Sequence, residues 1–244
     1  MVKRRTPEAP TAPSANRLLS SLPPEDYRRL EPLLEDAPLR LRRTLYKSGD
    51  VVEDVYFPGG GFVSVVTVLA NGGMVEVATI GREGMVGMSA RIPGIPEQPM
   101  TMVQMETDAC QRLPAAAFRR EMNRGGALHD IVSRFSQAYL SVVMQSTACN
   151  AIHRIEQRLA RWLLTAHDRV DKDQFPLTQE FLAMMLGAAR PTVTVVAGTL
   201  QRAGLITYKR GLISIIDRKA LEKASCECYR VTAALLGRSA APLQ

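Results

Sequence analysis

The sequence predicts an α+β fold with three parts: an N-terminal β-roll of the jelly-roll type (a double-stranded β-helix), a long helix, and a C-terminal winged helix-turn-helix. Glycine-rich turns recur roughly every ten residues between residues 47 and 84, and short β-branched segments at such spacing are typical of rolls and barrels. Residues 127–170 keep a helical periodicity. Residues 176–216 contain two short amphipathic helices around a glycine turn, followed by two β-branched segments.

The overall composition is that of an ordinary globular protein with one or two domains: 244 residues, 46% hydrophobic and 23% charged. The formal net charge of +7 favours a polyanionic partner. Residues 1–15 are basic and rich in proline, so we expect a disordered tail and no signal peptide. No uncharged run is long enough to span a membrane. We therefore expect a cytoplasmic protein with no membrane partner.

Residues 16–125 are expected to form the β-roll domain. Their first part, residues 16–36, is predicted to be helical. From residue 39 onward, glycine-rich turns separate short apolar segments that we expect to be strands. These segments are residues 51–52, 55–57, 62–68 and 74–80.

The long helix is expected to have a first section, residues 126–150, that packs against another helix. Its apolar residues follow a three-four or seven-residue stepping, which is typical of such a seam. We expect the seam to be a dimer interface; the alternative is that it packs on the β-roll of its own chain. The next apolar residues, through the single tryptophan Trp162, would begin the following domain. The predicted seam residues are Leu128, Ile131, Phe135, Ala138, Val142 and Cys149.

Residues 151–225 are expected to form the winged helix-turn-helix domain, with residues 226–244 as a C-terminal helix or tail. Thr178 has the position of an N-cap, Gly187 that of the turn between helices, and Pro191 fits the first turn of the second helix. That second helix has one apolar face, formed by Val193, Val196, Ala197 and Leu200. Its opposite face carries side chains that can contact bases and phosphates, and a glycine: Arg190, Thr194, Gly198 and Gln201.

A basic hairpin follows the second helix. Residues 207–216 are predicted to be two short strands around Lys209, Arg210 and Gly211, the position of a wing. Four basic residues and no acidic one lie between residues 189 and 216, so this surface should be positive. DNA is therefore the expected partner. Helix pairs that never contact DNA are the alternative, but they do not account for the acid-free span.

At these residues the sequence resembles the Crp/Fnr family of bacterial transcription regulators. The segment from Thr178 to Gly187 and the run Arg190-Pro191-Thr192-Val193 match the family's helix-turn-helix motif. The resemblance implies a cyclic-nucleotide-binding-like β-roll, a homodimer and an inverted-repeat DNA site. It also implies that Arg190 contacts a guanine and Thr192 a phosphate. The cyclic-AMP-dependent member of the family has a glutamate and a second arginine at the positions of Pro191 and Val195. The DNA sequence that this member binds is therefore not assumed to be the target of the present protein.

The residues expected to contact DNA divide into two groups. Thr192, Lys209 and Arg210 are candidates for phosphate contacts, which would make binding depend on salt. Base contacts are expected from the other face of the second helix. The full set of candidate DNA-binding residues is Thr178, Gln179, Arg190, Thr192, Thr194, Gln201, Lys209 and Arg210.

The ligand cassette that the resemblance implies is degenerate. Cyclic-nucleotide-binding members hold the ribose with a Gly-Glu pair and neutralise the phosphate with an arginine. Here Gly87 is followed by Met88, and the arginine position falls on Gln98 or Pro99. A buried phosphate without a guanidinium would lose its hydration without gaining a charged hydrogen-bond partner, which is unfavourable. We therefore expect no binding of cyclic AMP, unless Arg91 substitutes from the cassette loop.

No cofactor and no metal site are expected from the sequence. The four cysteines are Cys110, Cys149, Cys226 and Cys228, and none lies in the N-terminal region where some family members hold an iron–sulfur cluster. Cys226 and Cys228 form a Cys-x-Cys pair, which lacks the remaining ligands of a metal site; a redox sensor is the alternative for this pair. Three histidines without metal-ligand spacing give no catalytic set, so no enzyme activity is expected.

Taken together, the sequence predicts a sequence-specific DNA-binding transcription regulator of Crp/Fnr type, which binds an inverted repeat as a homodimer without cyclic AMP. The alternative is a ligand- or redox-responsive interaction module in which DNA binding is secondary. The expected partners are double-stranded DNA and a second copy of the chain. RNA polymerase and an unidentified small-molecule effector are further candidates.

Overall fold

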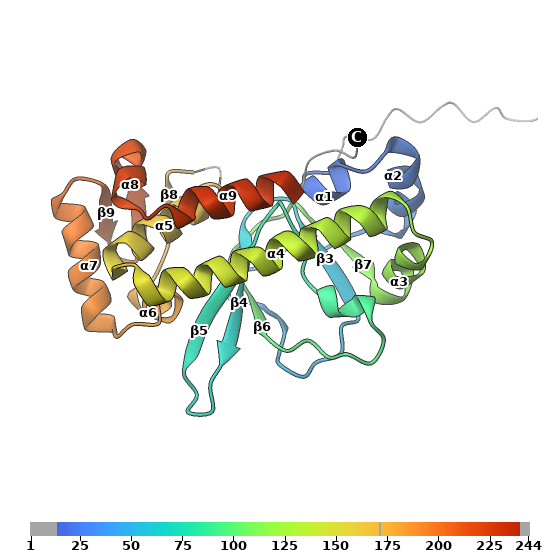
Figure 1. Ribbon diagram of the computed structural model, residues 1–244, viewed down its shortest axis with the longest axis horizontal. Helices are drawn as coiled ribbons and strands as arrows, with labels where there is room; N and C mark the ends of the chain where they lie inside the picture. Colours follow the sequence, from blue (N-terminus) through green and yellow to red (C-terminus); the bar gives the residue numbers. More distant parts are fainter. Residues whose placement is uncertain (1–13, 171, 240–244) are drawn as a thin grey trace, which may run out of the picture.

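The protein divides into a β-roll half and a helical half that are bridged by two long helices, α4 and α9 (Figure 1). The computed structural model describes residues 14–170 and 172–239. The basic tail expected at residues 1–15 therefore lies almost entirely outside the described residues. The observed architecture confirms the α+β class with a β-roll, a long helix and a C-terminal helix-turn-helix.

The N-terminal helical region is shorter and more broken than the single helical segment expected for residues 16–36. It consists of α1 (Arg17–Ser20), α2 (Pro24–Leu30) and a 3-10 turn η1 (Glu31–Leu33). The break falls at Pro23 and Pro24, because a proline has no N–H to continue a helix. Asn16 caps α1 and also donates from Nδ2 to the carbonyls of Pro58 and Gly84, which fastens the region to the roll.

The β-roll consists of two antiparallel sheets that enclose an apolar core. One sheet has the order β1-β7-β3 and the other β2-β6-β4-β5. Phe57, Val63 and Leu113 are almost fully buried between them, since alternate residues of a strand point to the same face. The strands are β1 (Glu35–Asp36), β2 (Thr44–Tyr46), β3 (Asp54–Pro58), β4 (Phe62–Val68), β5 (Met74–Ile80), β6 (Met100–Met105) and β7 (Cys110–Pro114).

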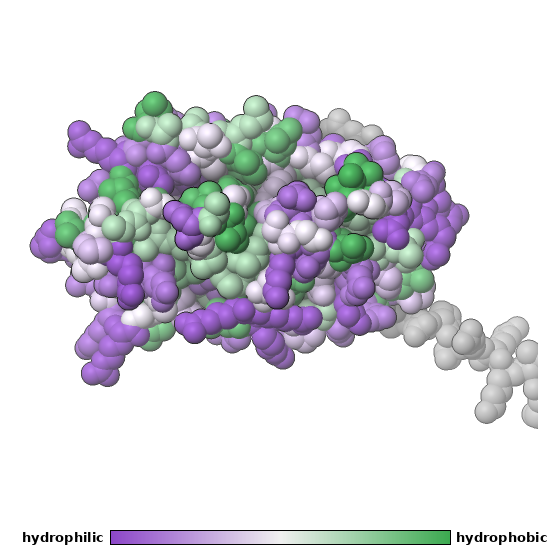
Figure 2. Space-filling view, turned by 90° about the horizontal axis from the view of Figure 1, so that it is seen from below, coloured by the Kyte–Doolittle hydropathy of each residue, from purple (hydrophilic) through white to green (hydrophobic). Residues whose placement is uncertain are grey.

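The predicted strands at residues 55–57, 62–68 and 74–80 correspond to β3, β4 and β5, whereas residues 51–52 lie outside any strand. A 3-10 turn η2 (Met88–Arg91) and helix α3 (Ala115–Asn123) complete the roll. Hydrophobic residues on the face seen in Figure 2 form separate small groups between hydrophilic ones. Three of the exposed apolar residues are at the free end of the β4–β5 hairpin: Val68, Leu69 and Met74.

The long helical segment is two helices, α4 (Ala127–Ile152) and α5 (Ile155–His167). The break lies at His153 and Arg154, a few residues beyond residue 150, where the first section is expected to end. Both residues have extended ψ angles, and Arg154 N donates to Gln157 Oε1 at 3.2 Å, which begins α5 as a new helix.

The residues of the expected dimer seam point mainly toward the interior of their own chain. Five of the six residues, Leu128, Ile131, Phe135, Val142 and Cys149, are buried within their own chain, and Ala138 is half-buried. These side chains already have partners, so they are not available to a second copy in this arrangement. The large apolar side chains that α4 leaves exposed are Leu140, Met144 and Ile152.

The C-terminal half packs the four helices α5 to α8 around a small antiparallel sheet of order β8-β10-β9. Helix α9 (Cys228–Ser239) then returns along α4 toward the roll (Figure 1). No single described helix is long and apolar enough to cross a membrane; α6 and α7 meet that criterion only as a pair, bent by 101°. The other elements are β8 (Gln174–Pro176), α6 (Gln179–Leu186), α7 (Arg190–Arg202), β9 (Ile206–Lys209), β10 (Leu212–Ile215) and α8 (Arg218–Ala224).

Candidate nucleic-acid interface

Helices α6 and α7 have the geometry of a helix-turn-helix. Their axes are bent by 101° from one another, within the range of this motif. Thr178 caps α6, because its Oγ1 accepts from Phe181 N at 3.2 Å. Gly187 ends α6 with a φ of +57°, a left-handed conformation that residues with a Cβ rarely adopt.

The polar face of α7 points to solvent, as the periodicity predicts. Val193, Val196, Ala197 and Leu200 are buried in the core of the C-terminal half. Exposed side chains of α7 on the other side are Arg190, Thr192, Thr194, Val195 and Gln201. Gly198 is half-buried. The exposed face therefore carries guanidinium, hydroxyl and amide groups, the types that contact phosphates and base edges.

The wing is a tight hairpin. Lys209 of β9 pairs with Leu212 of β10, so Arg210 and Gly211 form a two-residue turn. Their φ angles are +53° and +77°, and positive φ at both positions is characteristic of the type I′ turn that suits a twisted hairpin. Lys209 and Arg210 are both exposed at this tip. The predicted basic hairpin after the second helix is thus present.

Besides the cap residue Thr178, two more of the expected DNA-contacting side chains have partners inside the chain. Gln201 Oε1 accepts from Tyr208 N at 2.7 Å, which ties α7 to β9. Thr194 Oγ1 donates to the carbonyl of Arg190 at 3.1 Å, one turn earlier on α7. Gln201 therefore positions the wing relative to α7, a role that the sequence pattern does not reveal. Gln179 at the start of α6 is half-buried.

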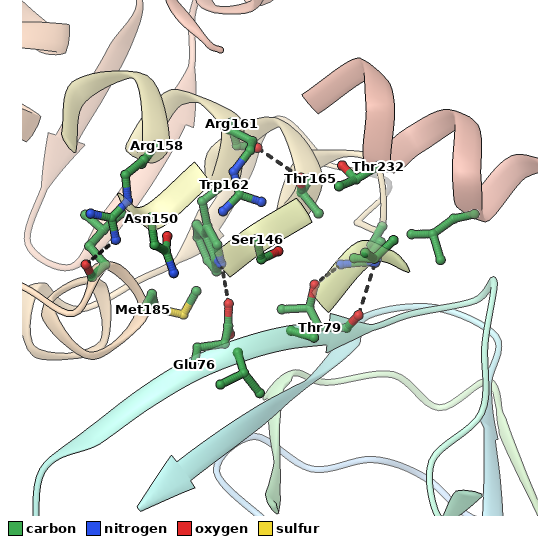
Figure 3. Close-up of a pocket in the computed structure, with 16 residues that line it drawn as sticks. Glu76, Thr79, Ser146, Asn150, Arg158, Arg161, Trp162, Thr165, Met185 and Thr232 are labelled. Atoms are coloured by element: carbon green, nitrogen blue, oxygen red, sulfur yellow. Dashed lines mark hydrogen bonds between the residues drawn. The ribbon is translucent and has the colours of Figure 1, made fainter. Parts of the chain in front are cut away.

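The β-roll half meets the C-terminal half at a buried polar junction (Figure 3). Trp162 of α5 donates from Nε1 to Glu76 Oε1 of β5 at 2.9 Å, and Ser64 Oγ donates to Glu76 Oε2 at 2.6 Å. The Trp162 ring also contacts Phe62 of β4 and Phe181 of α6 edge-on, with centroids 5.9 and 6.1 Å apart. Burial raises the pKa of Glu76 to about 7, although both hydrogen bonds oppose this shift.

An ion pair forms the second part of the junction. Arg169, which follows α5, pairs with Glu83 at 2.5 Å and donates to Thr79 Oγ1; both charged side chains are at most 8% exposed. Burial opposes the ionisation of Glu83, but the Arg169 guanidinium lowers its pKa below the ordinary value. Sequence reasoning misses this junction except for the burial of Trp162, because its partners are more than 80 residues apart.

The four cassette residues, Gly87, Met88, Gln98 and Pro99, come together around one open cavity of about 560 Å³ in the roll. No basic residue is among the described residues that line it, whereas the carboxylate-bearing Glu97 is. Nothing in this lining therefore neutralises a cyclic phosphate.

Arg91 does not substitute for the missing guanidinium. Its side chain donates to Ser136 Oγ at 3.2 Å and Ser133 Oγ at 3.4 Å on α4, and it does not line the cavity. The observed contacts of Arg91 therefore do not support a role in neutralising a cyclic phosphate. The aliphatic part of the lining comes from Val65, Val68, Val77, Ile80, Val86 and Val143.

Comparison with known proteins identifies the domain and the fold. Residues 157–224 match the family model of the Crp-like helix-turn-helix domain. A regulator of the CRP family from Thermus thermophilus, TTHB099, shares 21% identity with a TM-score of 0.64, over 78% of this chain and 96% of that one. A regulator of the crp/fnr family from Eubacterium rectale shares 18% identity with a TM-score of 0.65, over 86% and 98%.

FixK2 from Bradyrhizobium japonicum has the same fold, with 15% identity and a TM-score of 0.67 over 79% of this chain and 98% of that chain. No curated protein sequence matches the chain. The matched domain contains α6, α7 and the hairpin, the elements whose geometry is described above. The chain therefore contains a Crp-like helix-turn-helix domain and has the same overall fold as these regulators.

Proposed function

We propose that the protein is a cytoplasmic regulator that binds an inverted-repeat DNA site as a homodimer and does so without cyclic AMP. The observation that carries this proposal is the exposed face of α7 beside the basic hairpin tip. Arg190 and Thr192 lie at the start of α7, the end of a recognition helix that contacts bases in the major groove. Lys209 and Arg210 would contact phosphates on the flanking backbone.

The charge distribution supports DNA over a protein partner for this surface. Between residues 189 and 216 there are four basic residues and no acidic one. Phosphate neutralisation releases counterions from DNA, so such a surface gains affinity and a steep salt dependence. Arg190 is the candidate for guanine contact, since a guanidinium pairs with the O6 and N7 atoms of guanine.

A homodimer is supported by the exposed stripe of α4 formed by Leu140, Met144 and Ile152. These side chains are 52%, 63% and 79% exposed and are spaced by four and eight residues, which places them along one side of the helix. Two α4 helices that bury these stripes against each other would relate the two recognition helices by a two-fold axis. An inverted repeat with half-sites about 34 Å apart would match that symmetry.

Independence from cyclic AMP is supported by the cavity in the roll. Its described lining lacks a basic residue and includes Glu97. A cyclic phosphate would therefore be desolvated beside a carboxylate, which is unfavourable.

The test is selection of genomic DNA fragments by the purified, ligand-free protein at about 150 mM salt, near physiological ionic strength, followed by sequencing. Enrichment of an inverted repeat is the expected result. Absence of an enriched sequence, or enrichment that appears only after cyclic AMP is added, would contradict the proposal. A triple charge substitution on the stripe, Leu140→Glu, Met144→Glu and Ile152→Glu, should yield a monomer in sedimentation and reduce enrichment of paired half-sites.

A further inference from the structure

Four side chains with metal-binding atoms come together where α4 ends and α9 begins. Cys149 and His153 are four residues apart at the end of α4, which places both on one side of the helix. Cys226 and Cys228 flank Glu227 just before and at the start of α9. One ligand atom from each of the four residues lies within 4.8 Å of all the others.

The spacing of these atoms fits a single tetrahedral ion. Cys149 Sγ and Cys226 Sγ are 3.6 Å apart, and Cys228 Sγ and His153 Nδ1 are also 3.6 Å apart. Zinc–sulfur bonds of about 2.3 Å and zinc–nitrogen bonds of about 2.0 Å at tetrahedral angles place neighbouring ligand atoms about 3.5–3.8 Å apart. In an iron–sulfur cluster the ligands bind different iron atoms and are further apart.

The site is closed to solvent. Cys149, Cys226 and Cys228 are at most 3% exposed and form a cluster separate from the two hydrophobic cores. The His153 side chain is 17% exposed. Three thiols and one imidazole with little access to water are the donor set of structural zinc sites, whereas hard cations prefer oxygen ligands.

Neighbouring polar groups orient two of the four ligands. His153 Nε2 lies 3.2 Å from Glu227 Oε1, so the carboxylate would hold the imidazole with its proton on Nε2 and leave Nδ1 free to bind a metal. Gln145 Nε2 donates to Cys228 Sγ at 3.1 Å. Carboxylate–histidine–zinc arrangements of this kind are common around protein zinc sites.

We propose that Cys149, His153, Cys226 and Cys228 bind one Zn²⁺ ion. Binding releases the three thiol protons and leaves three thiolates and a neutral imidazole on the metal, with a net charge of −1. The Arg158 guanidinium, which interacts electrostatically with Cys149 and Cys226, would balance this charge. The Cys-x-Cys pair alone lacks two ligands; the fold supplies them from α4.

The position of the site gives the ion a structural consequence. Cys149 and His153 lie at the end of α4, shortly before α5, the first helix of the C-terminal half, and the other two ligands lie just before and at the start of α9. One ion would therefore fasten α4, which extends into the β-roll half, to the segment between α8 and α9. Loss of the metal would loosen the connection between the halves, and this inference does not depend on DNA binding.

The test is the metal content of the full chain, purified under reducing conditions and dialysed against metal-free buffer. Elemental analysis should find one zinc per chain. Replacement by Co²⁺ should give the visible bands of tetrahedral cobalt and thiolate-to-metal charge transfer. Cys149→Ser and Cys226→Ser should each abolish both signals, whereas Cys110→Ser, which removes a buried thiol in β7 outside the cluster, should keep them.

A graded variant separates binding from folding. Glu227→Gln keeps all four ligands, so it should retain one zinc but lose it to a competing chelator at about 10–100-fold lower chelator concentration. The Co²⁺ titration of the wild-type chain needs no variant and remains informative if a cysteine variant does not fold. Failure of the reduced wild-type chain to take up Zn²⁺ or Co²⁺ would overturn the proposal. Zinc retained by both cysteine variants, or iron with acid-labile sulfide in the wild type, would also overturn it.

Discussion

The exposed face of α7 and the junction between the two halves use polar side chains in opposite ways. On α7, Arg190 and Thr192 are exposed to solvent. At the junction, Glu76, Glu83 and Arg169 are buried, and each has partners within the chain. Removing an exposed group loses only contacts with an external partner, whereas removing one member of a buried pair leaves its partner uncompensated. Substitutions in the two regions should therefore separate DNA recognition from stability.

The largest effect is expected from Arg169→Ala. It leaves Glu83 buried without its cation, which should lower the free energy of unfolding by about 3–5 kcal/mol. Urea unfolding followed by circular dichroism measures this change, with Arg202→Ala on exposed α7 as the matched arginine control, expected within about 0.5 kcal/mol of the wild type. Equal free energies of unfolding for the two variants would contradict the expectation that buried and exposed arginines differ in their contribution to stability.

A pH dependence is expected from Glu76. Its pKa in the folded protein is raised from 4.5 to about 7, so the native state binds the proton more tightly than the unfolded state. The resulting stability is fully present below pH 4.5 and is lost as the pH rises through about 7, by about 3 kcal/mol.

Glu76→Gln isolates this contribution from the other carboxyl groups. The amide stays neutral and keeps an oxygen for the Trp162 hydrogen bond, so the variant should gain stability relative to the wild type as the pH rises from 5 to 8. Denaturant midpoints across that range provide the measurement. A constant difference between the two proteins would show that Glu76 does not titrate there.

DNA recognition should respond to Arg190→Ala without a change in stability. The variant is expected to lose about 1–3 kcal/mol of discrimination at one base pair, because a guanidinium–guanine contact is removed. Lys209→Ala should weaken binding to all sequences alike and reduce the salt slope by about 1. Binding to a panel of single-base site variants compares the two. The assignment fails if Arg190→Ala discriminates as well as the wild type.

The smallest effect is expected from Gln201→Ala, because Gln201 is exposed on α7 and also has a hydrogen-bond partner within the chain. The lost hydrogen bond to Tyr208 N should cost about 1 kcal/mol of stability. If the Gln201 amide of the wild type serves only to position the wing, the affinity of the variant should fall equally for all DNA sequences. A loss confined to one base pair would instead assign Gln201 to base contact.

The helix-turn-helix could be predicted from the sequence because each of its signals is local. The cap at Thr178, the turn at Gly187 and the apolar face of α7 all lie within one short segment. The family resemblance added the β-roll and the cassette position, and the structure gathers the cassette residues around one cavity.

The junction and the cysteine–histidine cluster could not be predicted, because they join residues that only the tertiary fold brings together. Glu76 and Trp162 are 86 residues apart, and Cys149 and Cys226 are 77 apart. The partner that covers the apolar seam of α4 could not be predicted either, since periodicity shows that one face of a helix is buried but not what it packs against. Burial of Phe135 beside Gly84 in its own roll decides that question.

The placement of Trp162 gives the protein an intrinsic optical reporter. It is the single tryptophan of the chain, and its indole is held by a carboxylate of one half and between aromatic rings from both halves. Its emission spectrum therefore reports whether the two halves are docked, without an added label. A ligand, a metal chelator or DNA that separates the halves would shift this emission to longer wavelength, so time-resolved fluorescence can follow the opening directly.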